Sequence, residues 1–420
     1  MHMKLSRSSQ LALVVAASLG VASLITACQQ VTQTLTVDFV YVASAQAAGA
    51  NQYGEIDVFE INSESGLMRP IPTSPFPSGG RDPVAEAVSS DNANLFVVNQ
   101  DDNNITQFGI GTDGKLYANQ TVNTPGIFPL AVAASASNLF VVDLYQPLPI
   151  CSTANPCSGS ISVFQFVPPS SGRCTSTICM GLPANNAAVN GQYWPLTVSS
   201  APSDVIVPTA VNVLANGNFV YVTAYDSTPS TPVGYVFAFA VGSGGGLTAV
   251  PGSPFSVGSQ PSALASDSKS ANVYVADARG ADVHGYAVGA NGALTEMSGS
   301  PFPAGNQPSA IVVDPSYAYA YVANAQDATV TAYSISSTGA LSRTGSYATG
   351  QQPVAIGIDP STNHFLYVAN FLGNTVSGFE LSTTDGSLLD SQLSPYASDA
   401  NPTAVAAIPH NGTGAGIQTQ

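Results

Sequence analysis

Short hydrophobic runs separated by polar, turn-forming residues recur along most of this chain, and they predict β-strands. A typical run, Tyr321-Val322-Ala323-Asn324, starts on an aromatic residue and ends on a turn-forming asparagine. Runs rich in β-branched and aromatic residues, separated by Gly, Asn and Asp, are typical of antiparallel strands and turns. Helical periodicity is almost absent from the chain after residue 28, so the pattern predicts an all-β protein.

Four markers recur in a fixed order and define an internal repeat. The first is a proline that opens a short apolar strand, at Pro83, Pro129, Pro208, Pro261, Pro308, Pro353 and Pro402. The second is an aromatic-Val-small-Asn/Asp strand, starting at Tyr41, Phe96, Phe140, Tyr221, Tyr274, Tyr321 and Tyr367. The third is an alternating strand with a central aromatic residue, such as Val330 to Ile335, and the fourth is a Gly-x-Leu start, such as Gly339-Ala340-Leu341.

The spacing of the second marker gives the size of the unit. Tyr274 and Tyr321 are 47 residues apart, and Tyr321 and Tyr367 are 46 apart. One four-stranded sheet of that size cannot bury both of its faces, whereas sheets arranged radially cover one another and leave only short outer edges. The seven copies therefore predict a seven-bladed β-propeller of four-stranded antiparallel blades. The proline of each Ser-Pro-Phe segment, as in Ser300-Pro301-Phe302, is expected on the outermost strand, where a missing N–H is tolerated.

The two ends of the repeat region predict how the ring closes. The first unit begins with a second-marker strand, Phe39 to Ala43, and has no first strand. The last unit is a lone first strand, Pro402 to Ile408. We therefore expect the C-terminal strand to pair with the N-terminal blade.

The first residues predict export. Lys4 and Arg7 precede an apolar stretch, Leu11 to Ile25, which is too short to span a membrane and is typical of a secretory signal. Ile25-Thr26-Ala27-Cys28 resembles the bacterial lipobox, which implies that residues 1–27 are removed and that Cys28 is lipidated; ordinary cleavage is the alternative. Gln29 after the cysteine resembles a signal for the outer membrane. We expect a tether over 28–37, a propeller over 38–410 and a flexible tail over 411–420.

The net charge limits the kinds of partner that the protein can bind. Without Lys4 and Arg7, seven basic residues face 25 acidic ones, a net charge of −18. This charge disfavours nucleic acid and anionic lipid surfaces, so contact with a membrane is expected only through the anchor. We expect a monomer.

The third unit is longer than the others, because Phe140 and Tyr221 are 81 residues apart. Its insertions, 144–159 and 167–200, hold Cys151 with Cys157 and Cys174 with Cys179. Zinc binding is possible by spacing, but an oxidising compartment and the lack of a nearby histidine favour disulfides. The two insertions leave opposite ends of the blade, farther apart than a disulfide reaches, so the predicted bridges are Cys151–Cys157 and Cys174–Cys179. The insertions serve either binding or decoration.

The Tyr-Val-Ala-Asn strands, the segments Pro308 to Pro315 and Pro353 to Pro360, and the Gly-x-Leu turns resemble the YVTN-type propellers. They are most similar to the lactonase family named after 6-phosphogluconolactonase, over about residues 38–409. The resemblance implies hydrolysis of a sugar lactone at the mouth of the central channel. Three features oppose carrying this activity over. No histidine (His284, His364 or His410) is expected at the mouth as an acid or base. A phosphosugar needs cationic contacts, but the seven cations are scattered, and phosphorylated sugar lactones are cytosolic whereas this protein is expected to be exported.

The topology predicts which residues meet at the mouth. The binding candidates are Asp82, Asn99, Asp101, Asp226, Asp277, Asp327 and Asn370, and the weak catalytic candidates are Arg279, Asp282, Asp143 and Arg81. Asn and Asp at strand ends also cap turns, so a purely structural role is the alternative for each. No calcium-loop motif or cofactor motif is present, and neither metal nor cofactor is predicted. The leading hypothesis is a lipid-anchored propeller that recognises a partner protein or glycan; the alternative is a lactonase-like hydrolase for an unphosphorylated lactone or similar ester.

Overall fold

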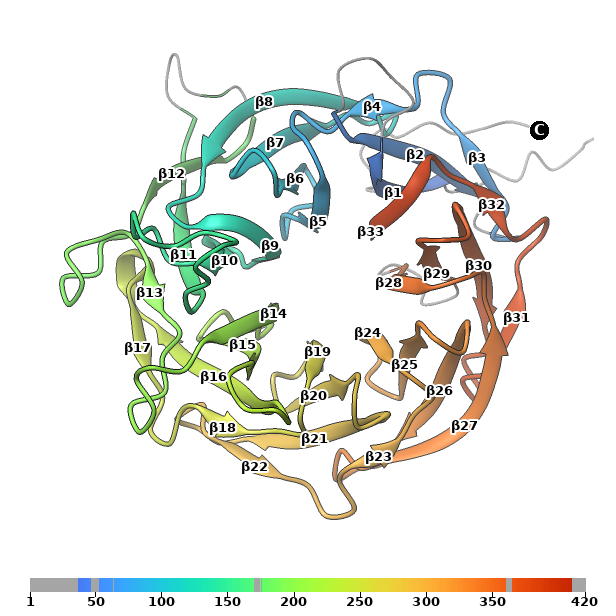
Figure 1. The fold of residues 1–420 in the computed structure, drawn as a ribbon. Helices are drawn as coiled ribbons and strands as arrows, with labels where there is room; N and C mark the ends of the chain where they lie inside the picture. Colours follow the sequence, from blue (N-terminus) through green and yellow to red (C-terminus); the bar gives the residue numbers. More distant parts are fainter. Residues whose placement is uncertain are drawn as a thin grey trace, which may run out of the picture.

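The computed structural model describes residues 37–46, 53–62, 64–169, 174, 176–359 and 365–409. Its strands form seven antiparallel sheets arranged in a ring about one axis (Figure 1). The predicted seven-bladed, all-β propeller is therefore confirmed. Cys28 with the predicted signal peptide, and the predicted tail over 411–420, lie outside the described residues. Within the described part of the chain, no helix has the length and apolar character needed to cross a bilayer.

Each blade is numbered from the N-terminus, and its strands follow one another from the axis to the rim. Blade 1 contains β1 (Val37–Gln46), β2 (Glu55–Asn62), β3 (Met68–Pro70), β4 (Phe76–Pro77) and, nearest the axis, β33 (Ala400–Ile408). Blade 2 contains β5 (Pro83–Val88), β6 (Asn94–Asn99), β7 (Asn104–Ile110) and β8 (Leu116–Asn123). Blade 3 contains β9 (Ile127–Ala134), β10 (Asn138–Tyr145), β11 (Ser160–Val167), β12 (Cys179–Pro183) and β13 (Trp194–Pro195).

The remaining blades repeat this plan. Blade 4 contains β14 (Ile206–Val213), β15 (Phe219–Asp226), β16 (Val233–Val241), the 3₁₀ turn η1 (Ser243–Gly245), β17 (Leu247–Ala249) and β18 (Phe255–Ser256). Blade 5 contains β19 (Pro261–Ser266), β20 (Asn272–Asp277), β21 (Asp282–Val288), β22 (Leu294–Glu296) and β23 (Phe302–Pro303). Blade 6 contains β24 (Pro308–Val313), β25 (Tyr319–Asn324), β26 (Thr329–Ile335) and β27 (Leu341–Ala348). Blade 7 contains β28 (Pro353–Ile358), β29 (Phe365–Asn370), β30 (Thr375–Leu381), β31 (Leu388–Asp390) and β32 (Tyr396–Ala397).

The ring closes as predicted, through pairing of the last strand with the first. β33 runs antiparallel to β1, with Val405 opposite Val42 and Ile408 opposite Phe39. Seven apolar clusters fill the seven spaces between adjacent blades, one per space, and the cluster between blades 7 and 1 includes Tyr367 and Val40. Backbone pairing and the burial of apolar side chains therefore stabilise the closure in the same way as the rest of the ring.

A bulge next to the first-marker proline links neighbouring blades. In every blade, the pairing of first and second strands skips the residue after this proline. A bulge re-aims the skipped side chain. Where this residue is Ser262 or Ser309, its hydroxyl donates to the carbonyl oxygen of the equivalent proline in the next blade, at 2.7 Å in both cases.

The outermost strand corrects one detail of the sequence prediction. In blades 1, 4, 5 and 7 this strand is split into two pieces, and the proline of the Ser-Pro pair lies between them rather than on a strand. The serine takes over the lost pairing: Ser300 Oγ, for example, accepts a hydrogen bond from the N–H of Gly285 at 3.1 Å. Blades 2 and 6 lack the Ser-Pro pair, and their outer strands β8 and β27 run unbroken.

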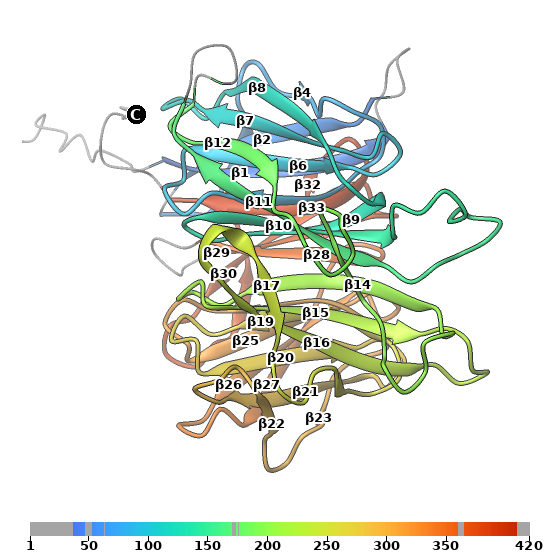
Figure 2. The same ribbon diagram turned by 90° about the vertical axis from the view of Figure 1, so that its left-hand side faces the viewer.

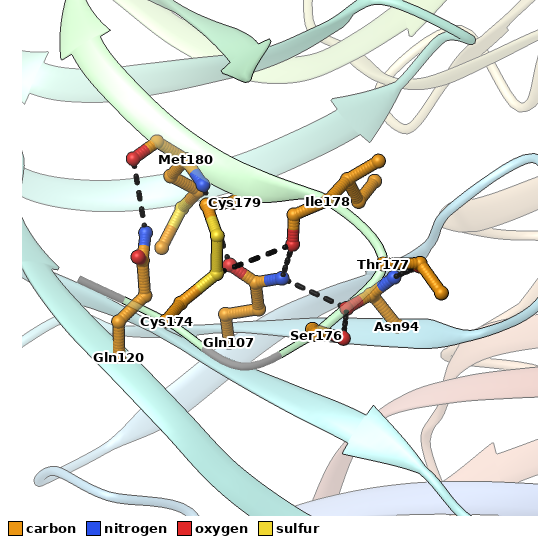
Figure 3. The surroundings of a disulfide bond; sticks show 9 residues. All are labelled: Asn94, Gln107, Gln120, Cys174, Ser176, Thr177, Ile178, Cys179 and Met180. Atoms are coloured by element: carbon orange, nitrogen blue, oxygen red, sulfur yellow. Dashed lines mark hydrogen bonds between the residues drawn. A yellow bond between two sulfur atoms is a disulfide. The ribbon is translucent and has the colours of Figure 1, made fainter. Parts of the chain in front are cut away.

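The insertions of blade 3 carry the predicted disulfides. Cys151 is bonded to Cys157 in the loop between β10 and β11, and Cys174 is bonded to Cys179, the first residue of β12, so both pairings are confirmed. The second bridge holds a loop that docks on blade 2 (Figure 3). There the amide of Gln107 donates to the carbonyl oxygen of Ile178 at 2.7 Å. The segment 176–180 of this insertion therefore forms a contact between blades, on the side away from the loops described below.

Candidate functional site at the mouth of the ring

Two sets of loops gather at one end of the ring, as the topology predicted, and we call this end the mouth. They are the loops from second to third strands and the loops that enter first strands. Backbone hydrogen bonds join them within a blade: the N–H of Gln100 donates to the carbonyl oxygen of Asp82 at 2.9 Å, and the N–H of Ala278 donates to that of Gln260 at 3.0 Å. Figure 2 shows the long loop between β10 and β11 projecting at this end.

The residues that enter the first strands adopt an unusual backbone conformation. Asp82, Phe128, Gln307, Gln352 and Asn401 each directly precede a first-marker proline, and each has φ between 53° and 58°. Non-glycine residues adopt such angles infrequently, and they do so where the surroundings dictate the conformation. The repeat thus holds a ring of defined, mostly polar residues around the axis.

Several of the predicted binding residues cap turns through their side chains. Asn99, Asp277 and Asn370 end second strands and are buried. The amide of Asn370 donates to Thr375 Oγ1 at 3.1 Å and to Ser377 Oγ at 3.0 Å. Asn99 makes the equivalent bonds in blade 2. These amides tie the loop to the third strand, which is the structural alternative foreseen from the sequence.

Asp143 and Asp226 take the capping position in blades 3 and 4. Asp143 has no exposed surface, and burial raises its pKa to about 7 although hydrogen bonds from Thr124, Ser162 and Gly126 oppose the rise. Asp226 is buried as well and accepts a hydrogen bond from the N–H of Thr228 at 2.8 Å. Neither carboxyl is accessible enough to act on a ligand at the mouth.

One arginine and several carboxylates do come together at the mouth, on blade 2. Arg81 Nε donates to Asp102 Oδ1 at 2.7 Å, and the Arg81 guanidinium also donates to the backbone oxygen of Asp101 at 3.2 Å. Burial acts to raise the pKa of Asp102, but hydrogen bonds from Arg81 and its charge outweigh burial and hold it below the usual value. Asp82 has a raised pKa, first through burial and then through the charge of Asp101. We call Arg81, Asp82, Asp101 and Asp102 the blade-2 cluster.

The other mouth candidates are Asp327, Arg279 and Asp282. Asp327 is exposed and accepts hydrogen bonds from Asn306 at 2.7 and 2.9 Å. Arg279 is exposed and forms no ion pair with any described residue. Asp282 Oδ1 lies 3.4 Å from Nε2 of His284, a residue that was predicted from the sequence to lie away from the mouth. The position of His284, two residues along the strand from Asp282, was a signal that the two side chains share one face.

The fold and the mouth thus define a seven-bladed propeller with an acidic mouth. Residues 295–406 match the family described as "Lactonase, 7-bladed beta-propeller". Over these residues, the match confirms the resemblance to the lactonase propellers that the Tyr-Val-Ala-Asn strands indicated. No curated protein matches the chain in sequence.

Solved structures support the same fold. A Bacteroides fragilis protein provisionally assigned as a 6-phosphogluconolactonase is 19% identical, with a TM-score of 0.67, and the alignment covers 89% of this chain and 99% of that one. The periplasmic gluconolactonase of Pseudomonas aeruginosa is 16% identical, with a TM-score of 0.67, over 90% of this chain and 100% of that one. At these identities the likeness concerns the fold.

Proposed function

We propose that this protein hydrolyses an unphosphorylated sugar lactone or similar ester at the mouth of the ring. The observation that carries the proposal is the blade-2 cluster, which places a guanidinium beside carboxylates at the entrance of a first strand. The similarity to lactonase propellers supports this reading over partner recognition. Recognition of a partner protein or glycan, which the sequence alone favoured, is therefore the second candidate function.

The chemistry of lactone opening suits the blade-2 cluster. A water molecule attacks the carbonyl carbon while a base accepts its proton, and a positive group stabilises the developing oxyanion. Asp82 would act as the base, because its raised pKa makes its carboxylate more basic than an ordinary one. Arg81 would stabilise the oxyanion, with Asp102 fixing the guanidinium. The ring oxygen then leaves with a proton, and the product is a hydroxy acid.

Charge at the mouth argues for an unphosphorylated substrate. A phosphate group is normally bound by several cationic side chains. Arg81 already pairs with Asp102, and Arg279 is the other arginine expected at this end. The carboxylates Asp82, Asp101 and Asp327 would repel a phosphosugar.

Turnover of a lactone panel by the purified protein tests the proposal. Glucono-δ-lactone and simple γ- and δ-lactones should be opened, and 6-phosphogluconolactone should not. Arg81→Ala and Asp82→Asn should each lower the rate by about 100-fold or more. Arg69→Ala, on the outer strand β3, is the matched control and should leave the rate unchanged. Absence of turnover across the panel, or full activity in both mouth variants, would overturn the proposal.

A second candidate function is recognition of a partner protein or glycan. The disulfide-held loop between β10 and β11 supports it, because this loop exposes Ile150 (68%) and Leu148 (39%) at the mouth end. Exposed apolar side chains on a rigid loop suit binding. Loss of a captured partner in an Ile150→Asp variant, with lactone turnover unchanged, would distinguish this function from hydrolysis.

We also propose export and attachment through Cys28, anchored to the bacterial envelope and, where two membranes are present, to the outer membrane. Two disulfides and the periplasmic location of one solved relative support export. Incorporation of labelled palmitate into the protein, and its loss in Cys28→Ala, would test the anchor. An unlabelled wild-type protein would contradict it.

A further inference from the structure

Blade 5 departs from a motif shared by three other blades. In blades 2, 6 and 7, an asparagine at the end of the second strand donates from its amide to two side chains at the start of the third strand. In blade 6, Asn324 Nδ2 donates to Thr329 Oγ1 at 3.1 Å and to Thr331 Oγ1 at 2.9 Å. The amide nitrogen is therefore the donor at the centre of a set of three side chains.

Blade 5 has Asp277, Asp282 and His284 at these three positions. The central donor is lost, because Asp277 brings a carboxylate where the other blades have an amide. Asp277 is 1% exposed, and its oxygens accept hydrogen bonds from the N–H groups of Ser259 at 2.6 Å, Gln260 at 2.9 Å and Arg279 at 3.0 Å. These bonds hold the carboxylate firmly on the loop but place no donor toward Asp282.

Asp282 has an oxygen with nothing to bind. Its Oδ1 is shielded from solvent, and no described residue donates a hydrogen bond to it. A buried oxygen of this kind costs free energy unless a proton or a cation meets it. The nearest polar atom of His284, Nε2, lies 3.4 Å away, longer than a good hydrogen bond.

Gly280 leaves a space between the two carboxylates. A Cβ at this position would lie 2.9 Å from Asp277 Oδ2, 2.9 Å from Asp282 Oδ1 and 3.0 Å from Asp282 Oδ2. The loop therefore faces a point almost equidistant from three carboxylate oxygens, which a side chain would fill. One ligand atom from each of Asp277, Asp282 and His284 lies within 4.8 Å of the others.

His284 is oriented as a metal-binding histidine. Its Nδ1 lies 3.2 Å from Glu296 Oε1, and Glu296 is in turn fixed by a hydrogen bond from Ser300 Oγ at 2.8 Å. A carboxylate on one ring nitrogen commonly leaves the other nitrogen free to bind a metal. The ring also stacks on Tyr286, with centroids 6.5 Å apart.

We propose that Asp277, Asp282 and His284 form a binding site for a divalent transition metal ion. The ion would take the place of the asparagine amide of the other blades, with Gly280 providing room and Glu296 orienting the imidazole. One nitrogen and two carboxylate ligands suit Zn²⁺ or Mn²⁺ better than Ca²⁺, which prefers oxygen ligands alone. The site lies on blade 5, and it does not depend on the hydrolysis proposed for blade 2.

Metal titration of the purified protein, stripped with a chelator, tests this proposal. Zn²⁺ and Mn²⁺ are titrated separately by calorimetry, and bound metal is measured after dialysis. We expect one ion per chain and a thermal midpoint that rises with metal concentration, because the ion binds only the folded state. Lactone turnover is not used as the readout, so failure of the proposed function leaves this test intact.

Variants identify the ligands. His284→Thr and Asp282→Asn should abolish binding, and Glu296→Gln should weaken it by about 10- to 100-fold. His284→Thr introduces the residue that blades 2 and 6 carry at this position, so it should fold normally. Asp327→Asn, an exposed carboxylate on blade 6, is the control and should bind like the wild type. Failure of the wild type to bind either ion, or unchanged binding by His284→Thr, would overturn the proposal.

Discussion

Thr403 Oγ1 lies 2.7 Å from the carbonyl oxygen of Pro83, so a side chain close to the C-terminus is hydrogen-bonded to the start of blade 2. The same hydroxyl is 3.1 Å from the carbonyl oxygen of Ala43 on β1. Ser262 and Ser309 make the corresponding bonds elsewhere in the ring. Thr403 therefore joins three separate strands at the closure, and it does so by the contact that links other blades.

Replacing Thr403 with valine should weaken the closure. The change keeps the shape of the side chain but leaves carbonyl oxygens at the seam without their donor. We expect the free energy of unfolding, measured by urea denaturation, to fall by about 1–3 kcal/mol. Ser309→Ala removes the same contact away from the closure and should cost a similar amount. An unchanged urea midpoint for Thr403→Val would show that the bond does not stabilise the ring.

The second-strand tyrosines allow a matched pair of substitutions. Tyr274 OH donates to the carbonyl oxygen of Gly339 in the next blade at 2.7 Å. Tyr367 has the same place in blade 7, but its hydroxyl has no hydrogen-bond partner among the described residues, because Tyr396 OH donates to the equivalent carbonyl of Gly66 at 3.2 Å. Tyr274→Phe should lower the free energy of unfolding by about 1 kcal/mol, and Tyr367→Phe should not lower it. Equal losses in the two variants would contradict this assignment.

Glu86 predicts how stability depends on pH. It lies on β5 at a position where the six other first strands carry Val132, Val211, Leu264, Ile311, Ile356 and Val405. Both carboxyl oxygens are shielded from solvent and lack a hydrogen bond of ordinary geometry. Burial raises the pKa of Glu86 well above its usual value, and the backbone of Ala406 offsets part of the rise.

An acid with a raised pKa stabilises the fold through its neutral form. Its contribution is complete below the pKa of glutamate in the unfolded chain, about 4.3, and is lost as pH rises through the folded pKa. The urea midpoint should therefore fall toward alkaline pH, and Glu86→Leu should be more stable there and less sensitive to pH. Burial also raises the pKa values of Glu55, to about 7, and Asp57, to about 6, so part of the slope should remain. The exposed Glu64, changed to Gln, serves as the control; a profile for Glu86→Leu that matches wild type would exclude this role.

Gln107 should control the docking of the second insertion on blade 2. Its amide nitrogen donates to Ile178 O at 2.7 Å and to Asn94 Oδ1 at 2.8 Å. Gln107→Leu removes both bonds, so hydrogen exchange of the backbone over 176–182 should become faster. Gln165→Leu, an exposed position on β11, is the control. Equal exchange rates in wild type and Gln107→Leu would mean that the disulfide between Cys174 and Cys179 and the remaining contacts, such as that of Gln120 with the carbonyl oxygen of Met180, hold the loop without Gln107.

The architecture could be predicted from the sequence because it is repeated. The second-marker strands predicted the number of blades, and the missing first strand at one end with the lone first strand at the other predicted the closure. The two insertions leave opposite ends of blade 3, and this separation predicted both disulfides. The split outer strand was missed. The Ser-Pro pair marks it, but only the structure shows that the serine hydroxyl replaces a backbone acceptor.

The site was harder to predict, because one residue type serves two roles. Asn99 and Asn370 end their strands in the same way as a ligand-binding residue would, and their burial and hydrogen-bond partners are needed to recognise them as caps. Asp143 was expected from the sequence to be accessible at the mouth, but it is buried. The spacing of Asp282 and His284 along one strand could have paired them, but Glu296 could not be grouped with them, because a contact between neighbouring strands has no signature in the spacing of residues along the chain.

The register of β1 against β33 also sets an orientation. Phe39 and Ile408 face each other at the end of the blade opposite the mouth, so the polypeptide enters and leaves the disc on its reverse side. A tether attached before Val37 would hold the propeller with this face toward the surface to which the tether is attached. The mouth, with Arg81, Asp82 and loop 146–159, would then face the surrounding medium and be accessible to diffusing molecules.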